Sequence, residues 1–255
     1  MCLISFAWKH HPKFKFILLA NRDEFYDRLA QPARYWSDDK KILAGRDLHA
    51  GGTWLGMHKN GKLAAITNYR DLKNIKPEAP SRGKLTLNFL KNNLSAPAYA
   101  EQLKPESTSY NGFNLLLLDQ QHLWYVSNVS GTSNPVKPGL YGLSNHLLDT
   151  PWPKVAKAKN ILADFDQYSP SQLLDAFANR ELAADHDLPD TGVGQALERK
   201  LSAMFIHFEN YGTRSTTLIT IDYEGRVQFR ERTFMQAEKE DKDALYKFNI
   251  PGSPN

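Results

Sequence analysis

The order of the expected elements along the chain predicts an α+β fold, with helices packed on mainly antiparallel sheets. Hairpins occupy the N-terminal part, two blocks of helices follow, and strands return before the C-terminal tail. Strand blocks near both ends suggest two sheets that face each other between helical layers. At 255 residues, and without a repeat or a linker, the chain is expected to form one domain over residues 1–255.

The first hairpin is expected to join residues 2–8 to residues 14–20. Both segments are rich in β-branched and aromatic residues, and the polar segment 9–13 between them supplies the turn. The second strand leads directly into the tetrapeptide Asn21-Arg22-Asp23-Glu24. Because a hairpin returns the end of its second strand to the start of its first, we expect this tetrapeptide to lie beside Cys2.

A second hairpin is expected over residues 51–68, where Asn60-Gly61 is a strong turn signal between two strand-like runs. It ends on an asparagine, Asn68, as the first hairpin does. The segments 25–50 and 69–82 on either side of it predict irregular structure. The other expected elements are helices over 83–93, 98–103, 153–165, 171–179 and 194–205, and strands over 113–119, 122–128, 139–143, 215–222 and 226–234. The charged and then Pro/Gly-rich tail, 235–255, is expected to be peripheral.

Charge and hydropathy exclude several classes of function. The net charge of +4 comes from lysines and arginines interspersed with acids, so no concentrated basic face for nucleic acid is expected. No apolar window reaches the roughly 18 residues of a membrane helix, and the first apolar run is too short for a secretory signal. We therefore expect a soluble, cytoplasmic protein without a transmembrane segment.

A single cysteine excludes an intramolecular disulfide framework and a multi-cysteine metal site. No spacing of histidines or carboxylates indicates zinc, and no Cys-x-x-Cys-His indicates covalently attached haem. We therefore expect no resident metal or cofactor, and haem is considered only as a bound ligand. Of the eight histidines, His146 and His207 lie near candidate site residues.

The cysteine, Cys2, directly follows Met1. Removal of Met1 would leave one residue that carries both a thiol with a pKa near ~8.5 and an α-amine with a pKa near ~7.7–8.0. Such a residue combines a good nucleophile with a base close to neutral pH. The alternative is that Met1 is retained and Cys2 is a small buried hydrophobe.

The tetrapeptide Asn21–Glu24 behind an N-terminal Met-Cys, followed by Gly51-Gly52-Thr53-Trp54, resembles the NRDE family, also called the transport and Golgi organisation protein 2 family. Further matches occur in order over nearly the whole chain, at Thr67-Asn68, Ser81-Arg82-Gly83, Tyr110–Asn114, Gly142–Asn145 and Tyr211–Ser215. The resemblance implies a four-layer αββα sandwich of the N-terminal-nucleophile hydrolase type. Within that fold type, the chain is most similar to the branch that contains penicillin V acylase and conjugated bile acid hydrolase.

In that branch a processed N-terminal cysteine attacks an amide. The resemblance therefore implies that Cys2 is the nucleophile and, through its α-amine, the base. Asn68 and Asn145 match the residues of the oxyanion hole, where amide donors stabilise the tetrahedral intermediate. Arg214 matches the late arginine beside the cysteine. Asn145 could alternatively cap a turn.

Arg22 and Asp23 match by position the arginine and aspartate of the branch. The match is imperfect, because the branch has Arg-x-x-Asp where this chain has Arg22-Asp23-Glu24, so the roles of Asp23 and Glu24 could be exchanged. Arg22 and Asp23 could also be a structural ion pair that closes the hairpin. The glycines of segment 51–54 predict a bend or close packing of strands, with Trp54 in the core or in a pocket wall.

These residues favour a cysteine amidohydrolase that acts on a non-peptide carbon–nitrogen bond of a small-molecule substrate. The alternative, suggested by the family association, is a non-catalytic carrier of haem or an acyl-chain ligand in the same pocket. Four arginines lie in loops after strands, where they could bind an anionic group or simply be solvated. They are Arg34, Arg46, Arg70 and Arg82.

Overall fold

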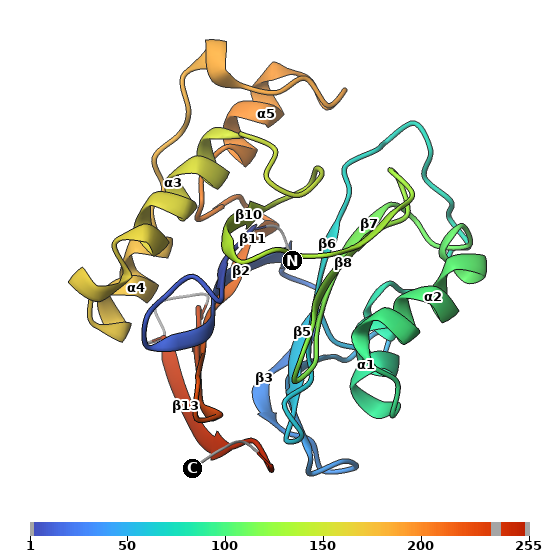
Figure 1. Cartoon of the computed structure of the whole chain (residues 1–255). Coiled ribbons are helices and arrows are strands. Elements are labelled where there is room, and N and C mark those ends of the chain that lie inside the picture. Colours follow the sequence, from blue (N-terminus) through green and yellow to red (C-terminus); the bar gives the residue numbers. More distant parts are fainter. Residues whose placement is uncertain (1–2, 236–240, 253–255) are drawn as a thin grey trace.

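The computed structural model describes residues 3–235 and 241–252, which form two antiparallel sheets packed face to face with helices on both outer faces. In Figure 1 the helices α3 and α4 lie on one side of the sheets, and α1 and α2 lie on the other. This arrangement confirms the predicted αββα sandwich. Residues 1–2, 236–240 and 253–255, and with them Cys2, lie outside the described residues.

The first sheet begins with the predicted N-terminal hairpin. Leu3 pairs with Asn21 and Trp8 with Phe16, so the start of β1 lies opposite the start of the tetrapeptide Asn21–Glu24, as expected. Every strand pair in this sheet is antiparallel. In spatial order its strands are β10 (Gly139–Leu143), β1 (Leu3–Trp8), β2 (Phe14–Phe25), β11 (Tyr211–Asp222), β12 (Arg226–Thr233) and β13 (Lys242–Asn249).

The second sheet contains the other predicted hairpin, in which Leu55 pairs with Ala65 and Met57 with Leu63. Gly61 in its turn has a φ of 94°, which a glycine adopts without steric strain. In spatial order the strands are β3 (Ala30–Tyr35), β4 (Ile42–Asp47), β5 (Leu55–His58), β6 (Leu63–Asn68), β7 (Phe113–Leu118), β8 (Leu123–Ser127) and β9 (Thr132–Pro135).

The helices cover the outer faces of the two sheets. Contacts join α1 to β5 and β6, α2 to β8 and β9, α3 to β1 and β10, and α4 to β11. The five α-helices of the described residues are α1 (Gly83–Lys91), α2 (Ala96–Ser107), α3 (Pro153–Ala163), α4 (Pro170–Phe177) and α5 (Gln195–Leu201).

Alternation along β2 shows how the sequence specifies these layers. Phe16 and Leu18 belong to the core between the sheets, whereas Ile17 and Leu19 belong to the core under α3 and α4. Successive side chains of a strand point to opposite faces, so a continuous apolar run is needed where both faces are buried. The apolar run 16–20 therefore places β2 in the middle of the sandwich.

The structure corrects the sequence interpretation at four places. Residues 25–50 are not irregular throughout, because β3 and β4 lie there. The strand β9 was not expected either. The helix expected over 98–103 runs from Ala96 to Ser107, and it includes Pro105, which has no N–H to donate to the preceding turn. Part of the expected peripheral tail forms β13 at the edge of the first sheet. Pro32 weakened the strand signal of β3 in the sequence, and the structure has a register shift there, between Gln31 and Arg34.

Candidate functional site

A cleft of two adjoining halves opens where β2, β5 and β6 meet the start of α1. One half has a volume of 770 Å³ and a mostly polar lining, which we call the polar half. The other has a volume of 590 Å³ and a mostly apolar lining, which we call the apolar half. Phe25, Asn68, Arg82 and Asn111 line both halves, so the two volumes form one continuous amphiphilic cleft.

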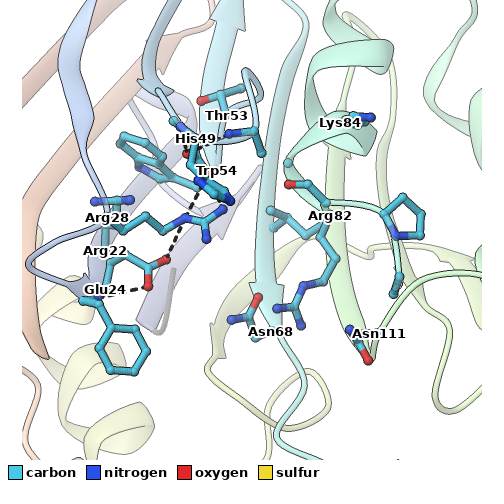
Figure 2. A pocket seen from close by; sticks show the side chains of 18 of the residues that line it. Arg22, Glu24, Arg28, His49, Thr53, Trp54, Asn68, Arg82, Lys84 and Asn111 are labelled. Carbon is cyan, nitrogen blue, oxygen red and sulfur yellow. Dashed lines mark hydrogen bonds and ion pairs between the residues drawn. The ribbon is translucent and has the colours of Figure 1, made fainter. Parts of the chain in front are cut away.

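Figure 2 shows the polar half, with Arg22, Glu24 and Arg28 on one side and Arg82, Lys84 and Asn111 on the other. Asn68 lies between the two groups. The first group comes from the end of β2 and the turn after it, and the second from the loop before α1, its first turn and the residue before Gly112. The cleft therefore gathers side chains from both sheets.

Strand alternation divides the tetrapeptide between two environments. Arg22 and Glu24 line the polar half. Asn21 lies on the opposite face, where its Nδ2 donates to the carbonyls of Phe177 and Met204 at 3.0 and 2.8 Å. Asp23 is also turned away from the cleft and accepts from Thr213 Oγ1. Arg22 and Asp23 thus lie on different faces of β2 and do not form the ion pair considered from the sequence.

Arg22 is held by an aromatic surface. Its guanidinium lies 4.1 Å from the centre of the Trp54 ring, and the whole residue is only 5% exposed. Within the described part of the chain, Arg22 makes no side-chain hydrogen bond or ion pair. Burial lowers the pKa of Arg22, and the nearby Glu24 carboxylate offsets part of that effect. The cleft therefore contains a desolvated cation.

Two glycines make this arrangement possible. A Cβ atom on Gly45 would overlap the indole ring of Trp54, so the bare backbone of β4 provides the surface on which that ring lies. A Cβ on Gly52 would lie 2.6 Å from the carbonyl carbon of Gly83, so this glycine allows the start of α1 to approach the start of β5. The sequence predicted close packing at segment 51–54, and Trp54 forms part of the pocket wall.

Two acids of the polar half are already engaged by a neighbouring arginine. Arg28 Nη2 lies 2.7 Å from Asp47 Oδ2, and its Nε lies 3.7 Å from Glu24 Oε2. Hydrogen bonds from Arg28 and from the Ala50 amide hold the pKa of Asp47 below its usual value, against the opposing effect of burial. Arg82 donates to the Gly112 carbonyl at 3.0 Å. The lining thus carries four formal cations and two carboxylates.

Asn68 and Asn145 lie side by side in the structure. Asn145 Nδ2 donates to the Asn68 carbonyl at 3.0 Å, and the Arg70 amide donates to the Asn145 carbonyl at 2.8 Å. These bonds join the end of β6 in one sheet to the segment after β10 in the other. The side-chain amide of Asn68 lines both halves of the cleft and makes no hydrogen bond to another residue that the structure describes.

Arg214 has a different setting from the other predicted residues. It lies at a register shift between β2 and β11, and its Nη1 donates to the carbonyls of Phe25 and Tyr26 at 3.0 and 3.1 Å. It therefore fixes the backbone just beyond the tetrapeptide. Cys2, the predicted nucleophile, lies outside the described residues, whereas Leu3, which follows it, is paired with Asn21.

The apolar half has an exposed hydrophobic rim. Four large apolar side chains of its lining are 39–56% exposed, from the end of β2, the loop 69–82 and α5: Phe25, Leu72, Ile75 and Leu197. Clusters of exposed apolar side chains are unusual on a monomeric surface and are typical of binding sites.

Arg70, which lines this half, forms a buried ion pair. Arg70 Nη1 lies 2.7 Å from Glu198 Oε2, with side-chain exposures of 10% and 3%. Glu198 also accepts from the backbone amide of Thr191 at 2.8 Å. The pair joins the loop after β6 to α5, and no local pattern could predict it because its partners are 128 positions apart.

A second buried carboxylate joins the two sheets near the cleft. Glu231 of β12 is 2% exposed, and it accepts from the Ala33 amide at 2.6 Å and from Thr217 Oγ1 at 3.2 Å. Ala33 lies at the register shift of β3, where its amide is not used by the sheet. Burial raises the pKa of Glu231, although these hydrogen bonds and the Arg22 charge act in the opposite direction.

The described residues include no group of three histidine, cysteine, aspartate or glutamate side chains that could hold a metal ion. No helix in the described segments has the length and apolar character needed to cross a membrane.

A family model described as Transport and Golgi organisation 2 matches residues 1–236. The chain belongs to this family. It is 35% identical to the mouse (Mus musculus) Transport and Golgi organization 2 homolog, with 95% of each chain covered, and 35% identical to the human (Homo sapiens) homolog with the same coverage. The family named from the motifs is therefore confirmed, and the expected cytoplasmic location stays a prediction.

Among solved structures, the chain is similar to a Caenorhabditis elegans N-acylethanolamine-hydrolyzing acid amidase ortholog. The TM-score is 0.53 at 8% sequence identity, over 86% of this chain and 92% of that one. This likeness confirms the predicted fold of the N-terminal-nucleophile hydrolase type. At such low identity it concerns the fold alone.

Proposed function

We propose that this chain is an amide hydrolase that cleaves a non-peptide carbon–nitrogen bond in a small substrate, with Cys2 as the nucleophile. The observation that carries the proposal is the position of the cleft. β1 begins at Leu3 opposite Asn21, and the next residue of β2, Arg22, lines the cleft together with Asn68. Leu3, the residue that follows Cys2 in the sequence, therefore lies beside the strand that lines the cleft.

In this proposal, loss of Met1 leaves the α-amine of Cys2 as the base that takes the thiol proton. The thiolate sulfur attacks the amide carbon, and the carbonyl electrons move onto the oxygen. The side-chain amide of Asn68 and the second N–H of Asn145 would donate to that oxyanion. Collapse of the intermediate breaks the carbon–nitrogen bond, and the α-ammonium protonates the departing amine. Water then cleaves the thioester, which releases a carboxylic acid and restores the thiol.

The amide chemistry also agrees with the name of the worm protein, which describes hydrolysis of N-acylethanolamines. The buried Arg22 would favour the thiolate form of a nearby cysteine, because a cation stabilises the charged form of an acid. Asp23 would act from the opposite face of β2, where Thr213 orients its carboxylate. Arg214 would support the site indirectly, through the backbone of Phe25 and Tyr26.

The test combines mass spectrometry with a panel of N-acyl amides of different chain lengths. We expect intact mass to show that Met1 is absent, and iodoacetamide to label Cys2 much faster than an ordinary thiol. Turnover of at least one amide should disappear in Cys2→Ala, while circular dichroism shows the same fold. Retention of Met1 in protein that turns over amide would exclude the processed-cysteine mechanism.

A second candidate function is a non-catalytic carrier of an acyl chain. The exposed rim of the apolar half favours it, because four exposed apolar side chains could hold a chain without any reaction. The described residues that line this half include no histidine or methionine, but they include Tyr69 and Tyr211, and tyrosine also ligates haem iron in some proteins. The preference for an acyl chain therefore rests on the apolar rim. Equal binding of a fluorescent fatty acid by the parent and Cys2→Ala, no turnover of any amide, and no Soret shift with haem would support this carrier.

A further inference from the structure

The first observation concerns the state of Arg22. A buried cation that lacks a charged partner carries a large desolvation cost, which an anionic group nearby reduces. Arg22 is 5% exposed and lines the polar half, and in the described part of the chain no carboxylate forms an ion pair with it. Its stacking on Trp54 fixes the guanidinium in place without satisfying its N–H donors. The side chain is therefore preorganised to receive an anion.

The second observation is the opposite wall of the polar half, which is formed by the start of α1. Arg82 and Lys84 lie there, the first turn of α1 contains no acidic residue, and no side chain caps this end of the helix. The N-terminus of a helix carries a partial positive charge and favours a bound anion. Gly52 and Gly83 pack closely, which brings this helix end to the cleft.

Two carboxylates in the same lining must be considered, because they would repel an anion. Asp47 Oδ2 accepts from Arg28 Nη2 at 2.7 Å, and its Oδ1 accepts from the amides of His49 and Ala50. Glu24 Oε2 lies 3.7 Å from Arg28 Nε, and Glu24 Oε1 accepts from the Phe25 amide at 3.0 Å. Both acids are held on the β2 side by Arg28, so the positive charges of Arg22 and of the α1 wall exceed the negative charge.

The third observation is continuity with the apolar half. Asn68, the proposed oxyanion donor, lines both halves, so a bond that spans the junction would lie beside it. A ligand that fills the cleft therefore needs an anionic head, an amide near the junction and an apolar chain. Arginine and a helix N-terminus together suit a phosphate, whose oxygens accept several charge-assisted hydrogen bonds.

We propose that the polar half is a phosphate subsite, and that the substrate class is a long-chain N-acyl amide with a phosphate ester on its amine portion. The acyl chain lies in the apolar half, and the phosphate lies between Arg22 and the start of α1. The position of the scissile bond rests on the proposed hydrolase function. The phosphate subsite itself rests only on the lining of the cleft.

The test is a binding measurement on the full chain carrying Cys2→Ala, so that no ligand is consumed. Three probes share one acyl chain: N-dodecanoyl-2-aminoethyl phosphate, neutral N-dodecanoyl-2-aminoethanol and the carboxylate N-dodecanoylglycine. Isothermal titration gives a dissociation constant for each. We expect the phosphate probe to bind at least about tenfold tighter than the neutral one, because hydrogen bonds to charged groups are stronger than those between neutral groups. The carboxylate should fall between them.

Three charge-removing variants locate the preference. Arg22→Gln and Lys84→Gln should each reduce the preference for phosphate over the neutral probe several-fold. Lys91→Gln, at the other end of α1 and outside the lining of the cleft, removes the same charge and should leave it unchanged. Lys84 is exposed, so its variant tests the subsite even where Arg22→Gln disturbs folding. Circular dichroism monitors the fold of each variant.

Equal affinity for the phosphate and neutral probes would overturn the subsite, and so would an equal loss of preference in Lys91→Gln. Tighter binding of the carboxylate than of the phosphate would overturn the assignment to phosphate. The two proposals fail separately. A phosphate preference without hydrolysis of any amide removes only the hydrolase, and hydrolysis of neutral amides without a phosphate preference removes only the subsite.

Discussion

Replacement of Gly45 by alanine tests how the cleft holds its buried cation. An added Cβ would overlap the six-membered ring of Trp54, which is 8% exposed and has little room to move away. Overpacking of a filled core costs about 1–3 kcal/mol. Displacement of the ring also weakens its contact with Arg22, now at 4.1 Å, and cation–π contacts contribute about 0.5–2 kcal/mol. We expect Gly45→Ala to lower the free energy of unfolding by about 2–4 kcal/mol.

Urea unfolding followed by far-UV circular dichroism measures this loss. The matched control is the double variant Gly45→Ala with Trp54→Phe, because phenylalanine lacks the ring atoms that the new methyl group would meet. The double variant should be more stable than the sum of the two single losses predicts, by about 1 kcal/mol or more. Strict additivity, or a Gly45→Ala variant within about 0.5 kcal/mol of the parent, would refute the packing of Trp54 against β4.

Three further predictions concern buried polar groups. Burial raises the pKa of Glu231, so the stability that this group contributes is present at low pH and is lost as the pH rises through the raised pKa. Glu231→Gln should therefore flatten the decline of the free energy of unfolding with pH above the usual glutamate range. An unchanged pH profile of that free energy contradicts this prediction. Asn21→Ala leaves the carbonyls of Phe177 and Met204 unpaired and should cost about 2–4 kcal/mol in urea unfolding, whereas a cost below about 0.5 kcal/mol counts against it. Glu198→Ala should cost about 3–5 kcal/mol, because it isolates a buried arginine charge, and the double variant with Arg70→Ala should recover part of this loss.

The sequence predicted the layers well because their signals are local. Apolar runs such as 16–20 specify a strand with two buried faces, and Asn60-Gly61 specifies a tight turn. Of the missed strands, β3 and β9 have little apolar content, and their pairing depends on neighbours elsewhere in the sheet. The strand β4 was missed although it begins with the buried apolar run 42–44. β13 alternates between exposed and half-buried residues at a sheet edge, which resembles a polar tail until its partner β12 is known.

The site was predicted in part for the same reason. Motif resemblance located Arg22, Asn68 and Asn145, and the structure brings these three toward one cleft. It could not show which tetrapeptide residues face the cleft, because that depends on the register of β2 with its neighbours. It also gave no indication of Lys84 or Glu198, since a single charged residue on a helix is usually solvated.

The alternation of the tetrapeptide Asn21–Glu24 has a consequence for natural variation in this family. Asn21 bonds to the carbonyls of Phe177 and Met204, and Asp23 accepts from Thr213 of the neighbouring strand β11. Changes at either residue should lower the amount of folded protein in a cell, since small losses of stability reduce abundance. Changes at Arg22 or Glu24, which face the cleft, should leave abundance closer to normal and impair what the cleft binds. Adjacent missense variants in one short motif would thus cause two separate kinds of defect, and a chaperone or a lower growth temperature would rescue only the first.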